Sequence, residues 1–224
     1  TADEGIEWQR DKQLMIASGK ALAVRGNARI EADKLLAYYE KNKAGKSSLS
    51  RLDAVGKVKI ASPTQQLTGE MGSYDLIKGI LVMTGKKVVL ISGKNKITAN
   101  QQIEFYEKRD MVVARKNAVA NNEGKLLRAN TLVGFFFQDK YGKTKLRRIQ
   151  AFDDVQVVTK TESILAEKGI YDVSSGIATL DGNIRISRDG NQLNGESAII
   201  NLNTGISKLL TESNAKSGNI SKKE

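Results

Sequence analysis

The segment Tyr74-Asp-Leu-Ile-Lys-Gly79-Ile80-Leu-Val-Met-Thr-Gly85 decides the fold, because it returns later as Tyr171-Asp-Val-Ser-Ser-Gly176-Ile177-Ala-Thr-Leu-Asp-Gly182. Both copies follow the pattern YDxxxGIxxxxG, and the second begins 97 residues after the first (171 − 74 = 97). The same offset relates Ile6-Glu-Trp8 to Ile103-Glu-Phe105. Several blocks in one register indicate a tandem duplication. Repeats of this kind stack so that each unit buries its face on its neighbours.

Between the turn signals, apolar and polar residues alternate, as in Asn183-Ile-Arg-Ile-Ser187 and Val58-Lys-Ile60. A period of two predicts half-buried strands, because successive side chains point to opposite faces of a sheet. Gly26-Asn27 and Gly182-Asn183 are expected at tight hairpins, since these residue types accept positive φ. Turn signals recur roughly every 8–12 residues, so the sequence predicts an all-β protein.

The composition excludes several kinds of chemistry. The chain has no cysteine and no histidine, which removes disulfides, thiolate metal sites and Ser-His-Asp catalysis. The acidic pair Asp153-Asp154 aligns with Gly56 at a turn, where aspartate is common for backbone reasons. We therefore expect a protein that is not an enzyme and that uses no cofactor and no metal.

The net charge of +11 permits an anionic partner, although lysine and arginine also keep β proteins soluble and protect strand edges. Aromatic residues make up only 5% of the chain, and Phe135-Phe136-Phe137 is an apolar run rather than a set of spaced rings. We therefore expect no nucleic-acid partner. No stretch approaches the run of about 20 apolar residues that a transmembrane helix needs.

Three segments carry a family resemblance: Gly26-Asn-Ala-Arg-Ile-Glu-Ala32-Asp-Lys34, the YDxxxGIxxLxGN element at 171–183, and the closing segment 191–209. On these residues the chain resembles the lipopolysaccharide transport protein A (LptA) and organic-solvent-tolerance (OstA-like) domain family, in its long tandem form. The resemblance implies an elongated, half-open β-jellyroll, a V-shaped stack of antiparallel strands with an apolar groove. We expect one continuous domain over 1–210, built of homologous halves at about 1–98 and 99–210. A polar, flexible tail is expected over 211–224.

The resemblance also implies a function. It predicts a periplasmic protein that binds lipopolysaccharide by its lipid A acyl chains and bridges inner- and outer-membrane components. Its edge strands would pair with like-folded jellyroll domains of transport proteins in both membranes, and head-to-tail homo-oligomers can form in the same way. Because the chain begins at Thr1 rather than at Met, we expect a signal peptide that has already been removed.

Alternation places one set of apolar residues on a single face in both halves. The predicted lipid-binding groove comprises Met15, Ile30, Val58, Ile60, Tyr74, Leu76, Leu81, Met83, Leu127, Phe136, Val155, Val157, Tyr171, Val173, Leu180, Ile184 and Ile186. Candidate contacts for lipid phosphates are Arg25, Arg29, Arg51, Arg148, Arg185 and Arg188. The same pattern fits a structural or adhesive β-solenoid with a sealed, dry core. A carbohydrate-active solenoid that uses carboxylates is a third hypothesis.

Overall fold

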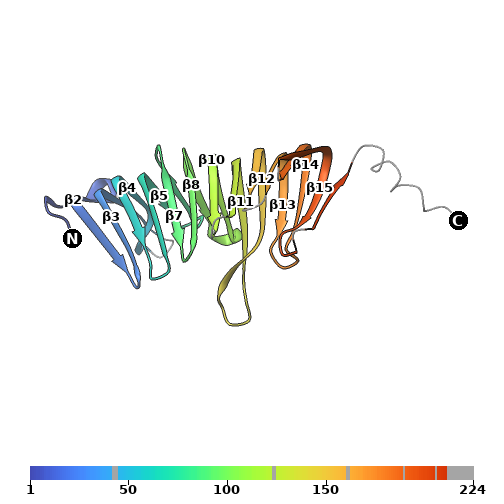
Figure 1. Ribbon diagram of the computed structural model, residues 1–224. Coiled ribbons are helices and arrows are strands. Elements are labelled where there is room, and N and C mark those ends of the chain that lie inside the picture. Colours follow the sequence, from blue (N-terminus) through green and yellow to red (C-terminus); the bar gives the residue numbers. More distant parts are fainter. Residues whose placement is uncertain (42–44, 123–124, 160–161, 189, 205, 211–224) are drawn as a thin grey trace. The chain divides into compact units, whose positions relative to one another are not determined.

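The computed structural model describes residues 1–41, 45–122, 125–159, 162–188, 190–204 and 206–210. These residues form strands joined by short turns, with two 3-10 helices, and every strand pair with a recorded register is antiparallel (Figure 1). The chain divides into two compact units, Thr1–Lys116 and Asn117–Glu224. The expected tail at 211–224 lies outside the described residues.

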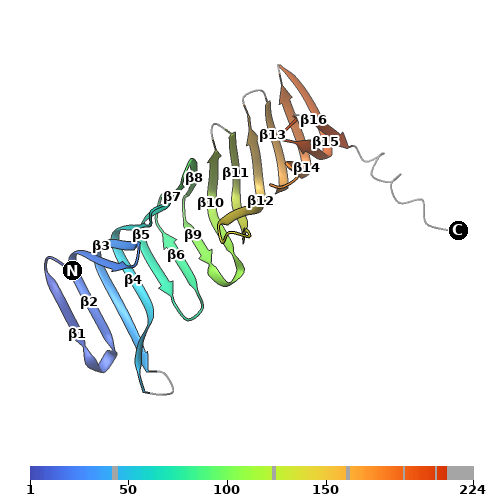
Figure 2. The same cartoon turned by 90° about the horizontal axis from the view of Figure 1, so that it is seen from below.

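The first unit contains most of the short strands. Its elements are β1 (Gly5–Gln9), η1 (Arg10–Lys12), β2 (Leu14–Arg25), β3 (Ala28–Lys41), β4 (Ser47–Ala61), β5 (Gln65–Asp75), β6 (Ile80–Thr84), β7 (Val88–Ser92), β8 (Asn95–Ala99), β9 (Gln102–Tyr106), η2 (Glu107–Arg109) and the start of β10 (Met111–Asn122). The hydrogen-bonded order is β1-β2-β3-β4-β5-β6-β9-β10, and β7 pairs with β5 and β8 (Figure 2).

The second unit contains the end of β10 and the strands β11 (Lys125–Gln138), β12 (Thr144–Val158), β13 (Glu162–Asp172), β14 (Ile177–Arg188), β15 (Asn191–Asn201) and β16 (Ile206–Leu210). Strands β11 to β16 pair in chain order. Pro63 lies in the bend between β4 and β5 of the first unit, where its missing N–H disturbs no strand pairing.

Five strands are bent near their middle by two consecutive residues with positive φ. In β4 these are Gly56 and Lys57, with φ of 79° and 48°, and the strand register shifts there. The other pairs are Gly19-Lys20 in β2, Lys116-Asn117 in β10, Asp153-Asp154 in β12 and Gly182-Asn183 in β14. Each pair is a β-bulge, which bends a strand sharply. We call this bend the corner.

Two sequence predictions are corrected by the corners. Gly182-Asn183 was expected at a hairpin and Asp153-Asp154 at a turn, but both pairs lie inside strands, β14 and β12. A bulge demands the same positive φ as a tight turn, so the residue types alone do not distinguish the two.

The corner divides the first unit into two layers. Strand β5 shows this directly, because its residues Met71–Asp75 pair with β6 whereas Gln65–Thr68 pair with the separate strand β7. We call the part of the unit on the β6 side of the corners layer A and the part on the β7 side layer B. The layers meet at the corner, where a Cβ built on Gly72 of layer A would lie 3.5 Å from Cγ1 of Val58 in layer B.

The duplication is visible in the strand bounds. Strands β1 to β5 and β9 to β13 begin and end at positions that differ by 97 residues, for example Gly5–Gln9 and Gln102–Tyr106 (102 − 5 = 97). The predicted all-β antiparallel fold with internal duplication is thus confirmed. The boundary between the compact units lies within β10, and a division into homologous halves near residue 98 remains a prediction about ancestry.

Candidate functional site

The inner face of layer A in the first unit begins with a closed row of side chains beside the corner. Cross-strand pairing aligns Leu35, Ala54, Gly72, Met83, Ile103 and Ala114. All six are buried, and Met83 and Ile103 have no exposed surface. This row is a core that no ligand reaches without displacing side chains.

The next row away from the corner is different. Pairing aligns one residue from each neighbouring strand on the same face: Trp8, Met15, Ala37, Leu52, Tyr74, Leu81, Phe105 and Val112. Trp8 is 43% exposed and the other seven are half-buried. We call this set the inner row. Its side chains are apolar apart from the hydroxyl of Tyr74 and the indole N–H of Trp8, and the row keeps contact with solvent.

The indole of Trp8 extends the inner row toward the next position on the neighbouring strands. Its ring packs edge-to-face against Tyr39 of β3, with 5.4 Å between ring centroids. Since Tyr39 is two residues beyond Ala37, the apolar surface continues past the inner row at this end. Sequence reasoning omitted Trp8, Leu52 and Phe105 from the groove, although Trp8 and Phe105 are equivalent in the repeat.

The hydroxyl group of Tyr74 in the inner row is held in place by a hydrogen bond. The hydroxyl of Tyr74 donates a 2.8 Å hydrogen bond to Oε1 of Glu107. Burial and this hydrogen bond raise the pKa of Tyr74 to about 12, while the guanidinium of Arg25 acts in the opposite direction. Arg25 is the last residue of β2, in layer B.

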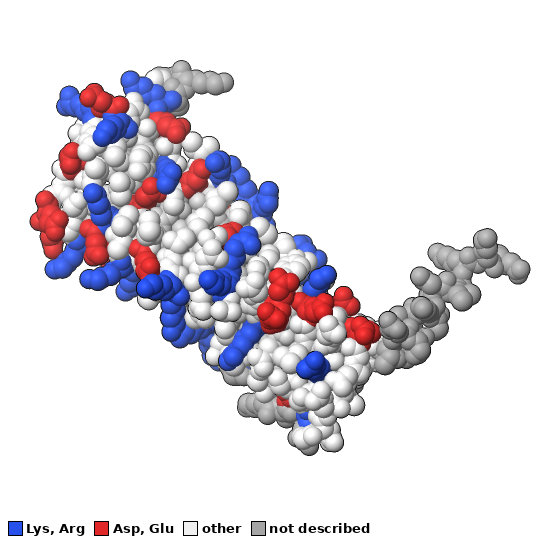
Figure 3. Space-filling model, turned by 90° about the horizontal axis from the view of Figure 1, so that it is seen from above, with Lys and Arg blue, Asp and Glu red and all other residues white. Residues whose placement is uncertain are grey.

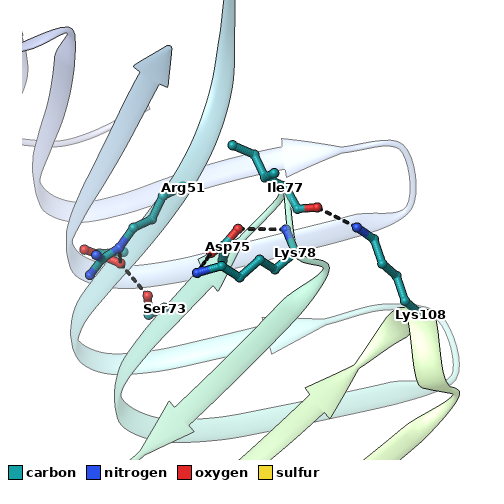
Figure 4. A network of polar contacts seen from close by, with 7 residues as sticks. Arg51, Ser73, Asp75, Ile77, Lys78 and Lys108 are labelled. Carbon is teal, nitrogen blue, oxygen red and sulfur yellow. Dashed lines mark hydrogen bonds and ion pairs between the residues drawn. The ribbon is translucent and has the colours of Figure 1, made fainter.

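The turn after Tyr74 is fixed by the polar contacts in Figure 4. Asp75 accepts the backbone N–H of Lys78 at 2.8 Å and pairs with its ammonium at 3.2 Å. The ammonium of Lys108, next to Glu107, donates to the carbonyl of Ile77 at 2.7 Å. These bonds tie the β5–β6 turn to the 3-10 helix that positions Glu107.

Layer B repeats the arrangement. Its inner face aligns Ala23, Ile30, Ile60, Leu67, Leu90 and Ile97. Leu67 and Leu90 are buried, whereas the other four are half-buried. Exposure therefore rises with distance from the corner in layer A and is mixed in layer B.

The second unit has equivalent rows, in which more of the side chains are buried than in the inner row of the first unit. The row equivalent to the inner row aligns Gly134, Ile149, Tyr171, Ala178, Ile200 and Ser207. Gly134, Ile149 and Tyr171 are half-buried, but Ala178 and Ile200 are buried. Leu81 of the first unit, the equivalent of Ala178, is larger and more accessible.

The register places fifteen of the seventeen predicted groove residues on the inner faces of the two units, whereas Leu76 and Val173 lie in the turns that follow β5 and β13. The seventeen differ in how much of each side chain is exposed. Six are buried: Val58, Met83, Val155, Leu180, Ile184 and Ile186. Ten are half-buried: Met15, Ile30, Ile60, Tyr74, Leu76, Leu81, Leu127, Phe136, Val157 and Tyr171. Val173 is 36% exposed.

A family model described as LptA/(LptD N-terminal domain) LPS transport protein matches residues 1–111 and again residues 87–206. The chain belongs to this family. The family consists of transport proteins and not of enzymes, in agreement with the sequence prediction of a non-enzymatic protein.

Two individual proteins are similar to parts of this LptA/LptD-family chain. An uncharacterized protein of Rhizobium meliloti (strain 1021) is 33% identical over 104 residues, which cover 42% of this chain and 56% of that protein. The chain thus spans about half the length of this curated relative. The crystal structure of LptH, the LptA-homologous periplasmic component of the lipopolysaccharide transport device of Pseudomonas aeruginosa, is 16% identical. Its TM-score is 0.45, and the match covers 58% of this chain and 89% of LptH.

The arginines of this family member divide between the two faces. Strand alternation puts Arg29, Arg51, Arg148 and Arg185 on the outer faces, away from the inner rows. Arg29 pairs with Glu31 at 3.1 Å, Arg51 pairs with Asp53 at 2.8 Å, and Arg148 stacks over Phe135. Arg25 and Arg188 alone among the six candidates point to the inner face. Lysine and arginine side chains are interleaved with acidic ones on the face in Figure 3.

One buried carboxylate lies outside the inner face. Glu104 of β9 is 3% exposed and accepts hydrogen bonds from Arg115, Tyr106 and Gln102, with 2.5 Å to Nε of Arg115. Burial alone would raise the pKa of Glu104, but the three donors outweigh burial and hold the pKa below its usual value. Such a satisfied buried pair fixes strand register rather than performing chemistry.

The residues described here contain no group of three acidic, histidine or cysteine side chains that could hold a metal ion. Among the described ranges, no helix combines the length and the apolar character needed to cross a membrane.

Proposed function

We propose that this chain binds the acyl chains of lipopolysaccharide against its inner rows and carries the lipid through the periplasm between inner- and outer-membrane components. The observation that carries this proposal is the inner row of the first unit. Six of its eight side chains carry no hydrogen-bonding N–H or O–H group, and Trp8 and Tyr74 carry one each. All eight retain contact with solvent. A sealed solenoid would bury them.

The physical basis is the transfer of methylene groups out of water. Each methylene that leaves water contributes about 0.8 kcal/mol. Because the inner row continues from strand to strand, an acyl chain that leaves one strand meets a similar surface on the next. Displacement along the row then exchanges equivalent contacts, and this is the property that a transport path needs.

The strand edges support the bridging part of the proposal. Within the described residues, β1 pairs with β2 alone and β16 pairs with β15 alone. The unpaired backbone edges of β1 and β16 can each accept a strand from a like-folded partner or from another copy of this chain.

The sole tryptophan provides a direct test, because Trp8 lies in the inner row. We expect hexa-acylated lipid A to shift the emission of Trp8 to shorter wavelength. We also expect an analogue with brominated acyl chains to quench it, since bromine quenches only on close approach.

A matched control moves the probe to the outer face. In the double variant Trp8→Phe, Val24→Trp the new indole stands at a position that is 66% exposed and faces away from the inner rows. Brominated lipid should leave its emission unchanged. Equal quenching of both proteins, or quenching of neither, would contradict the proposal and favour the sealed solenoid.

A further inference from the structure

The two layers of the first unit end in chemically different margins. On the inner face of layer B, the next positions beyond the apolar residues are polar on every strand except β3: Arg25, Ser62, Gln65, Ser92 and Asn95. We call this set the polar rim. Ser62 and Gln65 are tied to each other, because the N–H of Gln65 donates to Oγ of Ser62 at 3.2 Å and the N–H of Ser62 donates to the Gln65 carbonyl at 2.9 Å.

The margin of layer A is apolar on β3, β4 and the turn after β5, whereas Gln13, Glu107 and Asp110 stand at the ends of β2, β9 and β10. Tyr39 and Leu49 stand opposite each other beyond the inner row, and Leu76 lies in the turn that directly follows β5. The N–H of Leu76 donates to the carbonyl of Ser50 at 2.9 Å, which holds this residue against β4. All three side chains are half-buried. We call them the apolar rim.

The same division recurs in the second unit. Its apolar rim is Phe136, Leu146 and Val173, and Val173 donates its N–H to the Arg147 carbonyl at 3.0 Å, as Leu76 does to Ser50. Its polar rim is Asn122, Thr159, Glu162, Arg188 and Asn191.

The Ser62–Gln65 turn also recurs. The N–H of Glu162 donates to Oγ1 of Thr159 at 3.2 Å, and the N–H of Thr159 donates to the Glu162 carbonyl at 3.0 Å. The two copies, 97 residues apart, thus share this turn, and each has polar residues on the layer B rim.

Given the proposed function, on which this inference rests, we propose that the glycolipid binds in one fixed orientation, with acyl chains against the apolar rim of layer A and its phosphorylated sugar head group on the polar rim of layer B. Amides and hydroxyls both donate and accept, so they suit sugar hydroxyl groups. Arg25 and Arg188, which strand alternation places on the inner face, suit phosphate oxygens. The apolar rim has no comparable donors apart from the Tyr39 hydroxyl.

The absence of cysteine from the sequence allows each rim to be labelled separately. We would prepare Leu49→Cys on the apolar rim and Gln65→Cys on the polar rim, attach a benzophenone to each, and irradiate with hexa-acylated bisphosphoryl lipid A. Hydrolysis of the lipid esters and amides, followed by mass spectrometry, then shows which part of the lipid carries the crosslink. We expect fatty-acid adducts at position 49 and glucosamine-phosphate adducts at position 65, each in at least fivefold excess.

Neighbouring outer-face positions serve as controls, since Ser48→Cys and Gln66→Cys differ from the two test sites by one residue and point to the opposite face. Adducts of the same composition at both rims, or the reverse assignment, overturn the fixed orientation while leaving lipid binding intact. Adducts at neither rim, with controls equally silent, overturn the proposed function itself.

A substitution tests the head-group contact independently. Arg25→Gln should weaken binding of bisphosphoryl lipid A about fivefold to tenfold and leave binding of a neutral monoacylglycerol unchanged. The corresponding change at the outer-face Arg29, already paired with Glu31, should alter neither. Equal losses for both ligands with Arg25→Gln would contradict a head-group contact at this rim.

Discussion

Introducing a carboxylate into the inner row should block lipid binding, and Leu81→Asp is the sharpest such change. Leu81 lies at the middle of the row, opposite Tyr74 on one side and Phe105 on the other. It is half-buried in the free protein, so the substitution removes little of the buried core beside Met83.

The magnitude follows from the two costs that the bound lipid would meet. Loss of contact with about two methylenes costs about 1.5 kcal/mol. Partial desolvation of the new carboxylate by an acyl chain adds at least about 1–2 kcal/mol. Since about 1.4 kcal/mol corresponds to a factor of ten, affinity for lipid A should fall about a hundredfold. Leu81→Ala, which keeps the surface neutral, should lower affinity about tenfold.

The assay is titration of Trp8 emission with lipid A, with urea unfolding of each variant to verify that the fold is retained. Val82→Asp supplies the control, because Val82 is adjacent in β6 and points to the outer face, where it is also half-buried. We expect its affinity to change less than twofold. Equal losses at positions 81 and 82, or none at either, would refute the assignment of the inner row as the binding surface.

Three further predictions concern stability. Gly72→Ala should be neutral or slightly stabilising, because the nearest atom to a new Cβ lies 3.5 Å away. The equivalent change Gly169→Ala places a Cβ 2.8 Å from a methyl group of the buried Leu180. It should lower the free energy of unfolding in urea by about 1–2 kcal/mol. Glu104→Gln should lower the free energy of unfolding by about 2–3 kcal/mol at neutral pH. Because the pKa of Glu104 is depressed in the folded protein, the difference from the parent should shrink as pH falls below the usual carboxyl range and through the folded pKa. A difference that does not depend on pH would argue against an ionised Glu104. Tyr74→Phe loses the hydrogen bond to Glu107 and should lower the free energy of unfolding by about 0.5–1.5 kcal/mol. It should also remove from the ultraviolet titration one tyrosine with a pKa of about 12. Persistence of that transition would contradict the assignment.

The sequence determined the architecture because the repeat and the alternation are local signals. The offset of 97 between Tyr74 and Tyr171 aligns the bounds of β1 to β5 with those of β9 to β13, and the period of two selected inner-face residues in both layers. Glycine and asparagine residues indicated where the chain bends, but not whether a bend is a hairpin or a corner within a strand. Gly26-Asn27 is a hairpin and Gly182-Asn183 is a corner, since both conformations need positive φ and differ only in where the following strand pairs.

The alternation does not predict accessibility, because in layer A the exposure of an inner-face residue depends on its distance from the corner rather than on residue type. Met83 and Leu81 are both apolar, lie two residues apart on one face and were predicted together, yet only Leu81 retains contact with solvent. The difference arises because Met83 packs where the layers converge, against Gly69 and Gly72, whereas Leu81 stands one row farther out. Strand alternation, by contrast, separates the arginines: Arg25 shares the face of Ala23, whereas Arg29 pairs with Val24 on the outer face. A protein with two layers joined at a corner therefore combines a closed core and an open apolar surface in one alternating sequence, and it is the cross-strand register that assigns each residue to one or the other.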